Sequence, residues 1–308
     1  MVICNKKIYA NEKDLEKLSL EDNFEALKKE KEKIINLGKV YFHPTQNLKK
    51  NLSYVLVFAE NLMKRDIPSG SVWHFKDTNY RPEILRDDVG CGMTMFLMTD
   101  TIPCQDWIKV LRNYSIGGGN HFLNIGKFNE NMNFLLLHAD LNEEKTVPKS
   151  VQEAKQMVED ASRKREQLIQ SILQELGISG ELFKDWPHNS IQVEEGQTTY
   201  LKGVVDSKKS QGVGLMGLTP IDGSFLYLQI AKNLNGYMQH GIGVKNYNFK
   251  KFYKKDLINP NLSYLTKETA PGEVNDSFIE YKETIGRFWP KYIFLDNILE
   301  NDLTFRMR

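Results

Sequence analysis

The pattern of hydrophobic and polar positions is most regular in residues 149–176, where apolar side chains recur at helical spacing and charged side chains lie opposite. Gly177 follows, a residue type that commonly ends helices. The pattern predicts a long amphipathic helix that ends at Gly177. We expect its charge run, Arg163 to Arg165, to belong to the solvated face; a nucleic-acid patch is the alternative. The apolar positions are Val151, Ala154, Met157, Val158, Ile169, Ile172, Leu173 and Leu176.

Shorter apolar runs bounded by glycine, proline or polar residues predict strands elsewhere. The predicted strands are residues 1–10, 40–42, 71–75, 93–98, 122–125, 134–138, 200–205 and 225–230. One or two surface helices are predicted between Lys13 and Leu37, a buried element over 52–63 and a helix over 107–114. The mixture indicates a fold with both helices and strands.

Composition narrows the class without naming a function. Apolar residues make up 41% of the 308 residues and charged residues 26%, as in soluble globular proteins. The net charge of +1 gives no global basic signature, so nucleic-acid contacts must come from a local patch. Three cysteines without framework spacing predict a reducing compartment. With no signal-peptide pattern and no apolar run of roughly 18 residues, we expect a cytoplasmic protein without membrane contact.

The segment Asp88 to Met93 holds the first candidate chemistry. A carboxylate and a thiol, Asp88 and Cys91, lie three residues apart, and Gly90 and Gly92 flank the cysteine. The glycines permit a tight bend that would point both side chains into one pocket. A buried structural cysteine after a turn is the alternative interpretation.

Four of the six histidines lie beside glycine, asparagine or predicted strand ends: His121, His138, His188 and His240. Together with Asp88 and Cys91 they could bind two metal ions that share a bridging thiolate. Thiolate and imidazole favour zinc, while the carboxylate leaves manganese or iron open. For each single histidine, a hydrogen-bonded core position is the alternative. The run of lysines and aromatic residues at 245–255 could bind phosphates and bases, or form a helix with an apolar stripe.

The order of these motifs, from about Pro68 to about Pro290, resembles the RtcB family of RNA ligases. The chain has Asp-Val-Gly-Cys-Gly-Met where the family has Asp-Ile-Gly-Cys-Gly-Met, and its Asn-His-Phe at 120–122 is similar to the family's. His138, His188-Asn189, Leu201-Lys202-Gly203, Pro220 to Ser224 and His240-Gly241-Ile242-Gly243 follow in the family's order. Single motifs are weak signals, but seven in one order are a strong one.

The resemblance implies one α+β domain over residues 1–308, with mixed β-sheets around a buried metal cleft and flanking helices. It implies a ligase that joins RNA 2′,3′-cyclic phosphate or 3′-phosphate ends to 5′-hydroxyl ends through a guanylylated histidine. The implied cofactors are two Mn²⁺ ions and GTP, and the implied partner is RNA with the broken or spliced ends of tRNA splicing and RNA repair. We expect a monomer.

The resemblance also implies roles for individual residues. Cys91 would bridge the two ions, with Asp88 and His121 completing one site and His138 and His188 the other. His240 would attack the α-phosphorus of GTP, and Lys202 would contact RNA or phosphate. The implied nucleotide-binding residues are Asn120, Asn189, Pro220, Gly223, Ser224, Gly241 and Gly243.

The chain departs from the family pattern at several nucleotide-binding positions, which hold Asn124, Val244, Val274 and Leu295. In addition, the family's His-Ser-Gly-Ser-Arg is His138-Ala139-Asp140-Leu141-Asn142 here. These departures favour two further hypotheses. One is a two-metal phosphatase or cyclic phosphodiesterase that acts on RNA ends without a nucleotide. The other is a non-catalytic, metal-stabilised RNA-binding homologue.

Overall fold

The computed structural model describes residues 48, 50–57, 63–64, 67–117, 121–142, 144–206, 213–217, 227–233, 237–240, 254–259, 261–266 and 292–307. This part of the chain is a mixed α and β structure with antiparallel sheets and few helices. The mixed class is therefore confirmed. The elements predicted before residue 48 lie outside the described residues, as does most of the lysine and aromatic run at 245–255. The single domain over 1–308 stays a prediction.

The larger sheet carries the strand ends that matter for function. Its strands run in the order β12-β13-β17-β6-β7-β5-β8, with β16 also paired to β17 and β15 paired to β16, and all these pairs are antiparallel. The bounds are β5 Gly92–Met98, β6 Phe122–Lys127, β7 Asn133–Ala139, β8 Glu181–Pro187, β12 Val213–Gly217, β13 Tyr227–Asn233, β15 Lys254–Lys255, β16 Leu262–Thr266 and β17 Tyr292–Met307.

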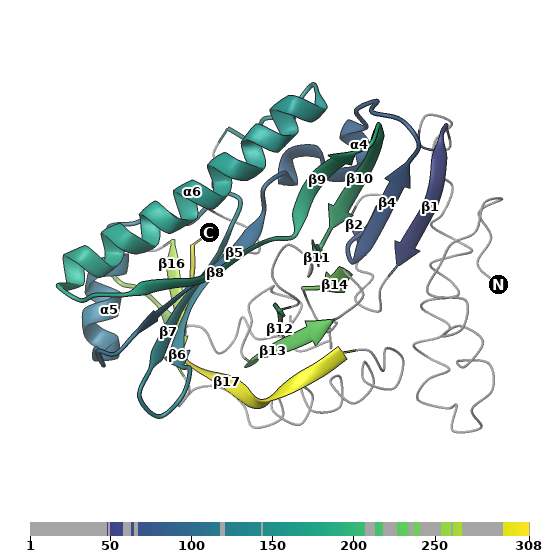
Figure 1. The fold of residues 1–308 in the computed structure, drawn as a ribbon. Coiled ribbons are helices and arrows are strands. Elements are labelled where there is room, and N and C mark those ends of the chain that lie inside the picture. The colour runs from purple at the N-terminus through teal and green to yellow at the C-terminus, as the bar shows by residue number, and fades with distance from the viewer. Residues whose placement is uncertain are drawn as a thin grey trace.

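A smaller antiparallel sheet lies beside the larger one (Figure 1). Its strands are β1 Leu52–Val57, β4 Ser71–Phe75, β10 Gln197–Lys202 and β9 Asn189–Glu194, in that order. Two short ribbons complete the described strands: β2 Met63–Lys64 with β3 Ile67–Pro68, and β11 Val204–Asp206 with β14 Tyr237–Gln239. The predicted strand over 200–205 is thus two strands, because Gly203 takes a φ of 66° between them.

The long helix α6, Val151–Leu176, spans both sheets (Figure 1). It begins after Ser150, whose hydroxyl accepts a hydrogen bond from the Glu153 backbone N–H, and it ends at Gly177 with a left-handed φ of 69°. These limits confirm the predicted helix. Ala154 packs with the core of the smaller sheet, while Ile169 and its neighbours pack with the core of the larger sheet. The helix therefore joins the two hydrophobic cores.

The prediction that Arg163 to Arg165 is solvated is wrong for Arg165, which is completely buried. Residues 161, 165, 169 and 172 follow each other at helical spacing, and all four are buried on the side of α6 that faces the sheets. Arg163 points away, with 61% of its side chain exposed. The buried guanidinium is compensated by Asp185, whose Oδ1 lies 2.9 Å from Nη2.

The other described helices are short. Helix α5, Cys104–Leu111, begins and ends earlier than the predicted 107–114 and packs Trp107, Val110 and Leu111 into the core. Helix α4, Pro82–Leu85, and the 3-10 turn η2, Arg86–Asp88, lead into β5. The buried element predicted over 52–63 contains β1, which ends at Val57.

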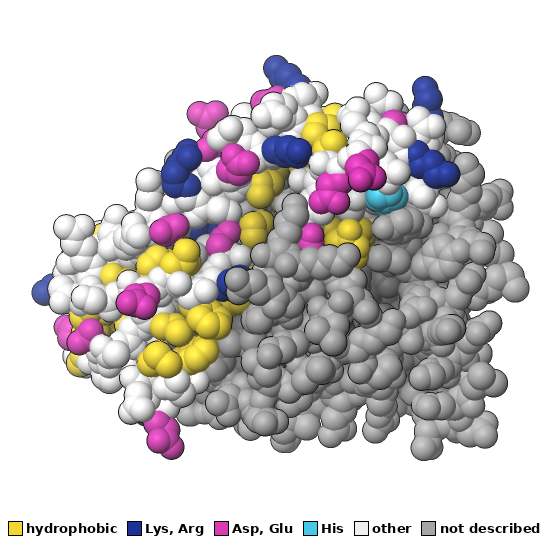
Figure 2. Space-filling view, viewed as in Figure 1, with side chains coloured by type: hydrophobic (Ala, Val, Ile, Leu, Met, Phe, Trp, Pro, Cys, Tyr) yellow, Lys and Arg dark blue, Asp and Glu magenta, His cyan; other side chains and the backbone are white. Residues whose placement is uncertain are grey.

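The described helices and the face shown in Figure 2 bear on membrane and nucleic-acid binding. None of the described helices is long and apolar enough to cross a membrane. Figure 2 shows Lys and Arg side chains interspersed with Asp and Glu over the described part of the face that carries α6. An RNA-binding surface of one charge sign is not visible on this part of the molecule.

Arg81 and Asp77 form an ion pair that secures the chain after β4. The Arg81 side chain is 2% exposed, its Nη1 donates to Asp77 Oδ1 at 2.8 Å, and its guanidinium lies 3.6 Å from the centre of the Phe75 ring. The hydrogen bonds from Arg81 hold the pKa of Asp77 well below its usual range. Burial raises the pKa of the neighbouring Tyr200 to about 12, so its hydroxyl stays protonated at neutral pH.

We expect Asp77→Asn to lower the free energy of unfolding by about 2–3 kcal/mol at pH 7, because a buried guanidinium loses its charged acceptor. The pKa of Asp77 is lower in the folded than in the unfolded chain, so its stabilisation is complete above the unfolded value. It is lost as the pH falls toward the folded value. The difference in urea stability between the wild type and the variant should therefore shrink steadily as the pH falls from about 4 toward 2. Asp160→Asn, in an exposed ion pair with Arg163, is the control and should have a clearly smaller effect; equal effects of the two variants would contradict the prediction.

Candidate metal centre

The candidate site lies at one end of four neighbouring strands of the larger sheet, in the order β6-β7-β5-β8. Because neighbours are antiparallel, the first residues of β5 and β6 lie beside the last residues of β7 and β8. Cys91 directly precedes β5, His121 precedes β6, His138 is paired with Met93 and Phe122 near the end of β7, and His188 follows β8. Strand order therefore brings together four side chains that are up to 97 residues apart in sequence.

The four side chains form a tight, buried group. Cys91 Sγ lies 3.2 Å from His138 Nε2 and 4.0 Å from His121 Nε2, and the Nε2 atoms of His138 and His188 are 3.3 Å apart. The donor atoms of Cys91, His138 and His188 all lie within 4.8 Å of one another. All four residues are between 2 and 6% exposed. His121 Nε2 lies 4.0 Å from the sulfur, but His121 is not part of this group of three.

The backbone around Cys91 is held by hydrogen bonds to neighbouring ligand-bearing segments. The Cys91 carbonyl accepts from the N–H groups of His188 and Asn189 at 3.0 and 3.1 Å, and the Gly90 N–H donates to the Asn189 carbonyl at 2.9 Å. Gly90 has a φ of 83°, and a Cβ there would lie 2.7 Å from Ala161 on α6. The glycine before Cys91 is therefore required both by conformation and by close packing.

Arg165 fixes the same segments from the other side. Its Nη1 donates to the Gly90 carbonyl at 2.6 Å and to the Ala139 carbonyl at 3.0 Å. These carbonyls belong to the residue before Cys91 and the residue after His138. Arg165 is therefore a positioning residue for both side chains, and the sequence interpretation missed it because a charge run on a helix is usually solvated.

A divalent metal ion fits Cys91, His138 and His188. Thiolate sulfur and imidazole nitrogen are ligands of borderline-soft ions such as zinc. Bonds of about 2.0–2.3 Å in a tetrahedral site place neighbouring donors roughly 3.3–3.6 Å apart. Two of the three separations here, 3.2 and 3.3 Å, are close to that range, and the third is no more than 4.8 Å. His138 Nε2 has two close neighbours, Cys91 Sγ and His188 Nε2. A ring nitrogen carries either one proton or one lone pair, so it can form a full hydrogen bond with only one of them. An ion satisfies all three donors.

The sequence predicts that Asp88 binds metal and that Lys202 contacts RNA or phosphate, but in the structure these two residues are paired with each other. Asp88 Oδ2 accepts from Lys202 Nζ at 2.7 Å, and Asp88 is not part of the group of three. The carboxylate beside His121 is instead Asp140, whose Oδ2 lies 3.6 Å from His121 Nε2. Sequence reasoning noted Asp140 only as a departure from a motif. Its position directly after β7, two residues beyond His138, is the signal that could have found it.

His240 lies against this group. It directly follows β14, and its ring centroid is 4.1 Å from that of His188 and 6.3 Å from that of His138. Its Nδ1 lies 2.9 Å from the Gly203 carbonyl, which also accepts the His240 backbone N–H at 3.2 Å. Because a carbonyl can only accept, Nδ1 carries the hydrogen and Nε2 carries the lone pair of the neutral ring.

Of the residues predicted to bind nucleotide, only Asn189 lies in the described part of the chain. It is 3% exposed, and its Oδ1 accepts from the Gly203 N–H at 2.8 Å, so its side chain fixes the turn that holds His240. Asn120, Pro220, Gly223, Ser224, Gly241 and Gly243 lie outside the described residues and stay predictions.

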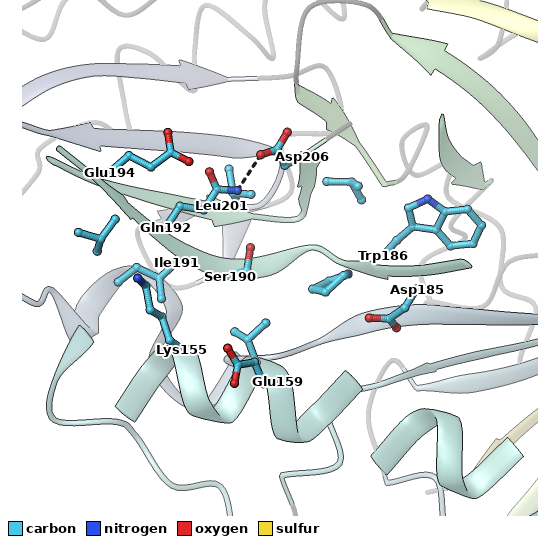
Figure 3. Close-up of a pocket in the computed structure, with 14 residues that line it drawn as sticks. Lys155, Glu159, Asp185, Trp186, Ser190, Ile191, Gln192, Glu194, Leu201 and Asp206 are labelled. Carbon is cyan, nitrogen blue, oxygen red and sulfur yellow. Dashed lines mark hydrogen bonds between the residues drawn. The ribbon is translucent and has the colours of Figure 1, made fainter. Parts of the chain in front are cut away.

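A separate cavity of about 350 Å³ lies between α6 and β9 (Figure 3). Its lining includes Glu159, Asp185, Glu194 and Asp206 with the single cation Lys155, and none of the clustered histidines. Asp206 accepts a hydrogen bond from Gln192 at 2.9 Å across this lining. The excess of carboxylates makes this cavity unsuited to a nucleotide phosphate.

Comparison with known proteins does not assign the chain to a family. No protein-family model matches it, and no curated protein matches it. The resemblance to the RtcB family therefore stays a prediction from the sequence motifs, and the site is defined by the residues and distances above.

We expect the purified protein to bind Co²⁺ with a thiolate-to-metal charge-transfer band in the near ultraviolet, because Cys91 lies among the imidazole donors. Cys91→Ser should abolish the band. Cys104→Ser, at the start of α5, is the matched control and should leave it unchanged. A band that depends on Cys104, or one that survives without Cys91, would contradict the assignment.

Gly203→Ala should shift the His240 ring from its position beside residue 203. An added Cβ would clash with Ser69 Oγ and lie 3.1 Å from His240 Cε1, at a φ of 66°. Gly196→Ala has the same left-handed conformation, with a φ of 76° and nothing within 4 Å, so it is the matched control for backbone strain of about 1–3 kcal/mol. We expect a larger loss of unfolding free energy in Gly203→Ala than in Gly196→Ala, and a change in the ¹⁵N shifts of the His240 ring only in Gly203→Ala. Equal losses with unchanged shifts would show that the contact is unimportant.

Proposed function

We propose that the protein is an RNA ligase of the RtcB type, which joins RNA 2′,3′-cyclic phosphate or 3′-phosphate ends to 5′-hydroxyl ends with GTP and Mn²⁺. The observation that carries the proposal is the position of His240, 4.1 Å between ring centroids from His188 in the buried cysteine–histidine group. A purely structural metal site needs its ligands alone. Here a further buried imidazole with a defined tautomer adjoins them.

The metal-binding part of the proposal follows the resemblance. Cys91 would lie between two Mn²⁺ ions, with His138 and His188 on one side and His121 with a carboxylate on the other. When bound, divalent ions offset negative charge on phosphate oxygens. Lys202, 2.7 Å from Asp88, would present a cation to the RNA phosphate beside this centre.

The chemistry proposed for His240 is nucleophilic. Nε2 attacks the α-phosphorus of GTP, so a P–N bond forms, the bond to the bridging oxygen breaks and pyrophosphate leaves. Nδ1 keeps its hydrogen on the Gly203 carbonyl, which stabilises the positive charge that develops on the ring. The nucleotide is then transferred to the RNA 3′-phosphate, after water opens any cyclic phosphate, and the 5′-hydroxyl displaces GMP.

One alternative uses the same centre without a nucleotide, as a phosphatase or cyclic phosphodiesterase on RNA ends. The observation that favours it is the change at positions where the RtcB pattern binds nucleotide. Asn124, which replaces an acidic residue, is completely buried within β6. In this alternative, 2′,3′-cyclic phosphate ends are hydrolysed without GTP.

The test is covalent labelling of the protein by α-³²P-GTP in the presence of Mn²⁺, with α-³²P-ATP in parallel. We expect an acid-labile, Mn²⁺-dependent label that is lost in His240→Ala, while metal content measured by mass spectrometry stays unchanged. His74→Ala is the matched control, because His74 is bonded to Thr199 and Gln197 on the smaller sheet, and it should keep the label.

Absence of label with every nucleoside triphosphate would exclude the ligase. If RNA with a 2′,3′-cyclic phosphate is then processed without nucleotide, the phosphodiesterase is the correct function. If neither reaction occurs while RNA still binds, the protein is a non-catalytic homologue.

A further inference from the structure

Asp140 is a buried carboxylate beside the candidate metal centre to which no role has been assigned. It directly follows β7, and its side chain is 3% exposed. Its Oδ2 lies 3.6 Å from His121 Nε2 and 2.9 Å from Lys145 Nζ, and its Oδ1 accepts from the Asn142 N–H at 3.0 Å. It occupies a position where the RtcB pattern has glycine, so the resemblance does not assign it.

The atom of His121 that faces Asp140 indicates whether Asp140 could bind a metal itself or only orient the histidine. A carboxylate that only orients a metal-binding histidine contacts the ring nitrogen that does not bind the metal. Here the same nitrogen, Nε2, lies 3.6 Å from Asp140 and 4.0 Å from Cys91 Sγ. Asp140 and Cys91 therefore both lie beside the coordinating nitrogen of His121. The three ligand atoms are not all within 4.8 Å of one another, so a bound ion would draw Asp140 and Cys91 closer together.

We propose that Asp140 is the carboxylate ligand of a second divalent metal site formed with His121 and Cys91. The inference rests on the proposed two-metal function and adds the residue that completes its second site. A carboxylate and a thiolate would balance the two positive charges of the ion, and the carboxylate oxygen suits Mn²⁺ better than a thiolate does.

A purely structural pairing with Lys145 explains less of the geometry. The Lys145 side chain is 52% exposed, so solvent already stabilises its charge without a buried partner. Asp140, in contrast, is almost completely buried and lies beside another buried titratable side chain. The carboxylate predicted for this site, Asp88, is paired at 2.7 Å with Lys202.

The experiment measures metal stoichiometry by inductively coupled plasma mass spectrometry and Mn²⁺ affinity by EPR titration in the full-length protein. We expect two ions per wild-type chain. Asp140→Asn should retain one and lose affinity for the other by at least roughly tenfold. Lys145→Met is the matched control, because it removes the ion pair but keeps the carboxylate, and it should retain both ions. Asp88→Asn tests the other candidate carboxylate and should also retain both ions.

A gain-of-signal variant covers the case in which Asp140→Asn does not fold. Asp140→Cys offers a second thiolate to the ion, so the Co²⁺ charge-transfer band should increase in intensity if residue 140 is a ligand. An unchanged band would overturn the proposal, as would a loss of one ion in Lys145→Met or in Asp88→Asn but not in Asp140→Asn.

These readouts separate the two proposals. Two ions in the wild type, with one lost in Asp140→Asn and no nucleotide label on His240, would support the metal site and exclude the ligase. Normal labelling with unchanged metal content in Asp140→Asn would exclude Asp140 as a metal ligand but would leave the ligase proposal intact. A wild type that binds no metal would exclude both.

Discussion

The packing of α6 on both sheets depends on the buried guanidinium of Arg165. The Arg165 guanidinium lies beneath α6 and donates to the Gly90 and Ala139 carbonyls while Asp185 balances its charge. Removing a charge from water is costly, and the cost is offset only where several acceptors are in place at once. The helix, the ends of β5 and β7 and the strand that carries Asp185 must therefore assume their positions together. Because Cys91 and His138 adjoin the two carbonyls, correct folding of the helix also positions the candidate metal ligands.

Antiparallel pairing explains how so few secondary-structure elements build a dense polar site. Strand ends that alternate in direction place a residue before one strand beside a residue after the next, so each of four strands contributes one side chain. Backbone groups just beyond the strand ends form hydrogen bonds between neighbouring loops. The Cys91 carbonyl, for example, accepts hydrogen bonds from the N–H groups of His188 and Asn189. The histidines and the cysteine are thus held on backbone that is already hydrogen-bonded.

Much of the secondary structure could be predicted from the sequence because it depends on local periodicity. The limits of α6 follow from its apolar spacing, Ser150 and Gly177, and β4 matches the predicted 71–75. Arg165 could not be distinguished from its solvated neighbours, because its acceptors lie on segments 20 to 75 residues away. Candidate ligands could be named by residue type, but their grouping depends on strand order. For the same reason, the proximity of Asp140 to His121 and the pairing of Asp88 with Lys202 required coordinates.

The depth of the cysteine–histidine group has a consequence for kinetics. With its four side chains between 2 and 6% exposed, an ion bound there is largely shielded from bulk solvent. Local opening of the strand ends would favour exchange of such an ion, and this motion breaks the hydrogen bonds that the Cys91 carbonyl accepts. The exchange rate of the ion would then follow the opening rate of the loop rather than the strength of the metal–ligand bonds. A protein built in this way can keep the ion that it acquired during folding, even when a competing ion is more abundant.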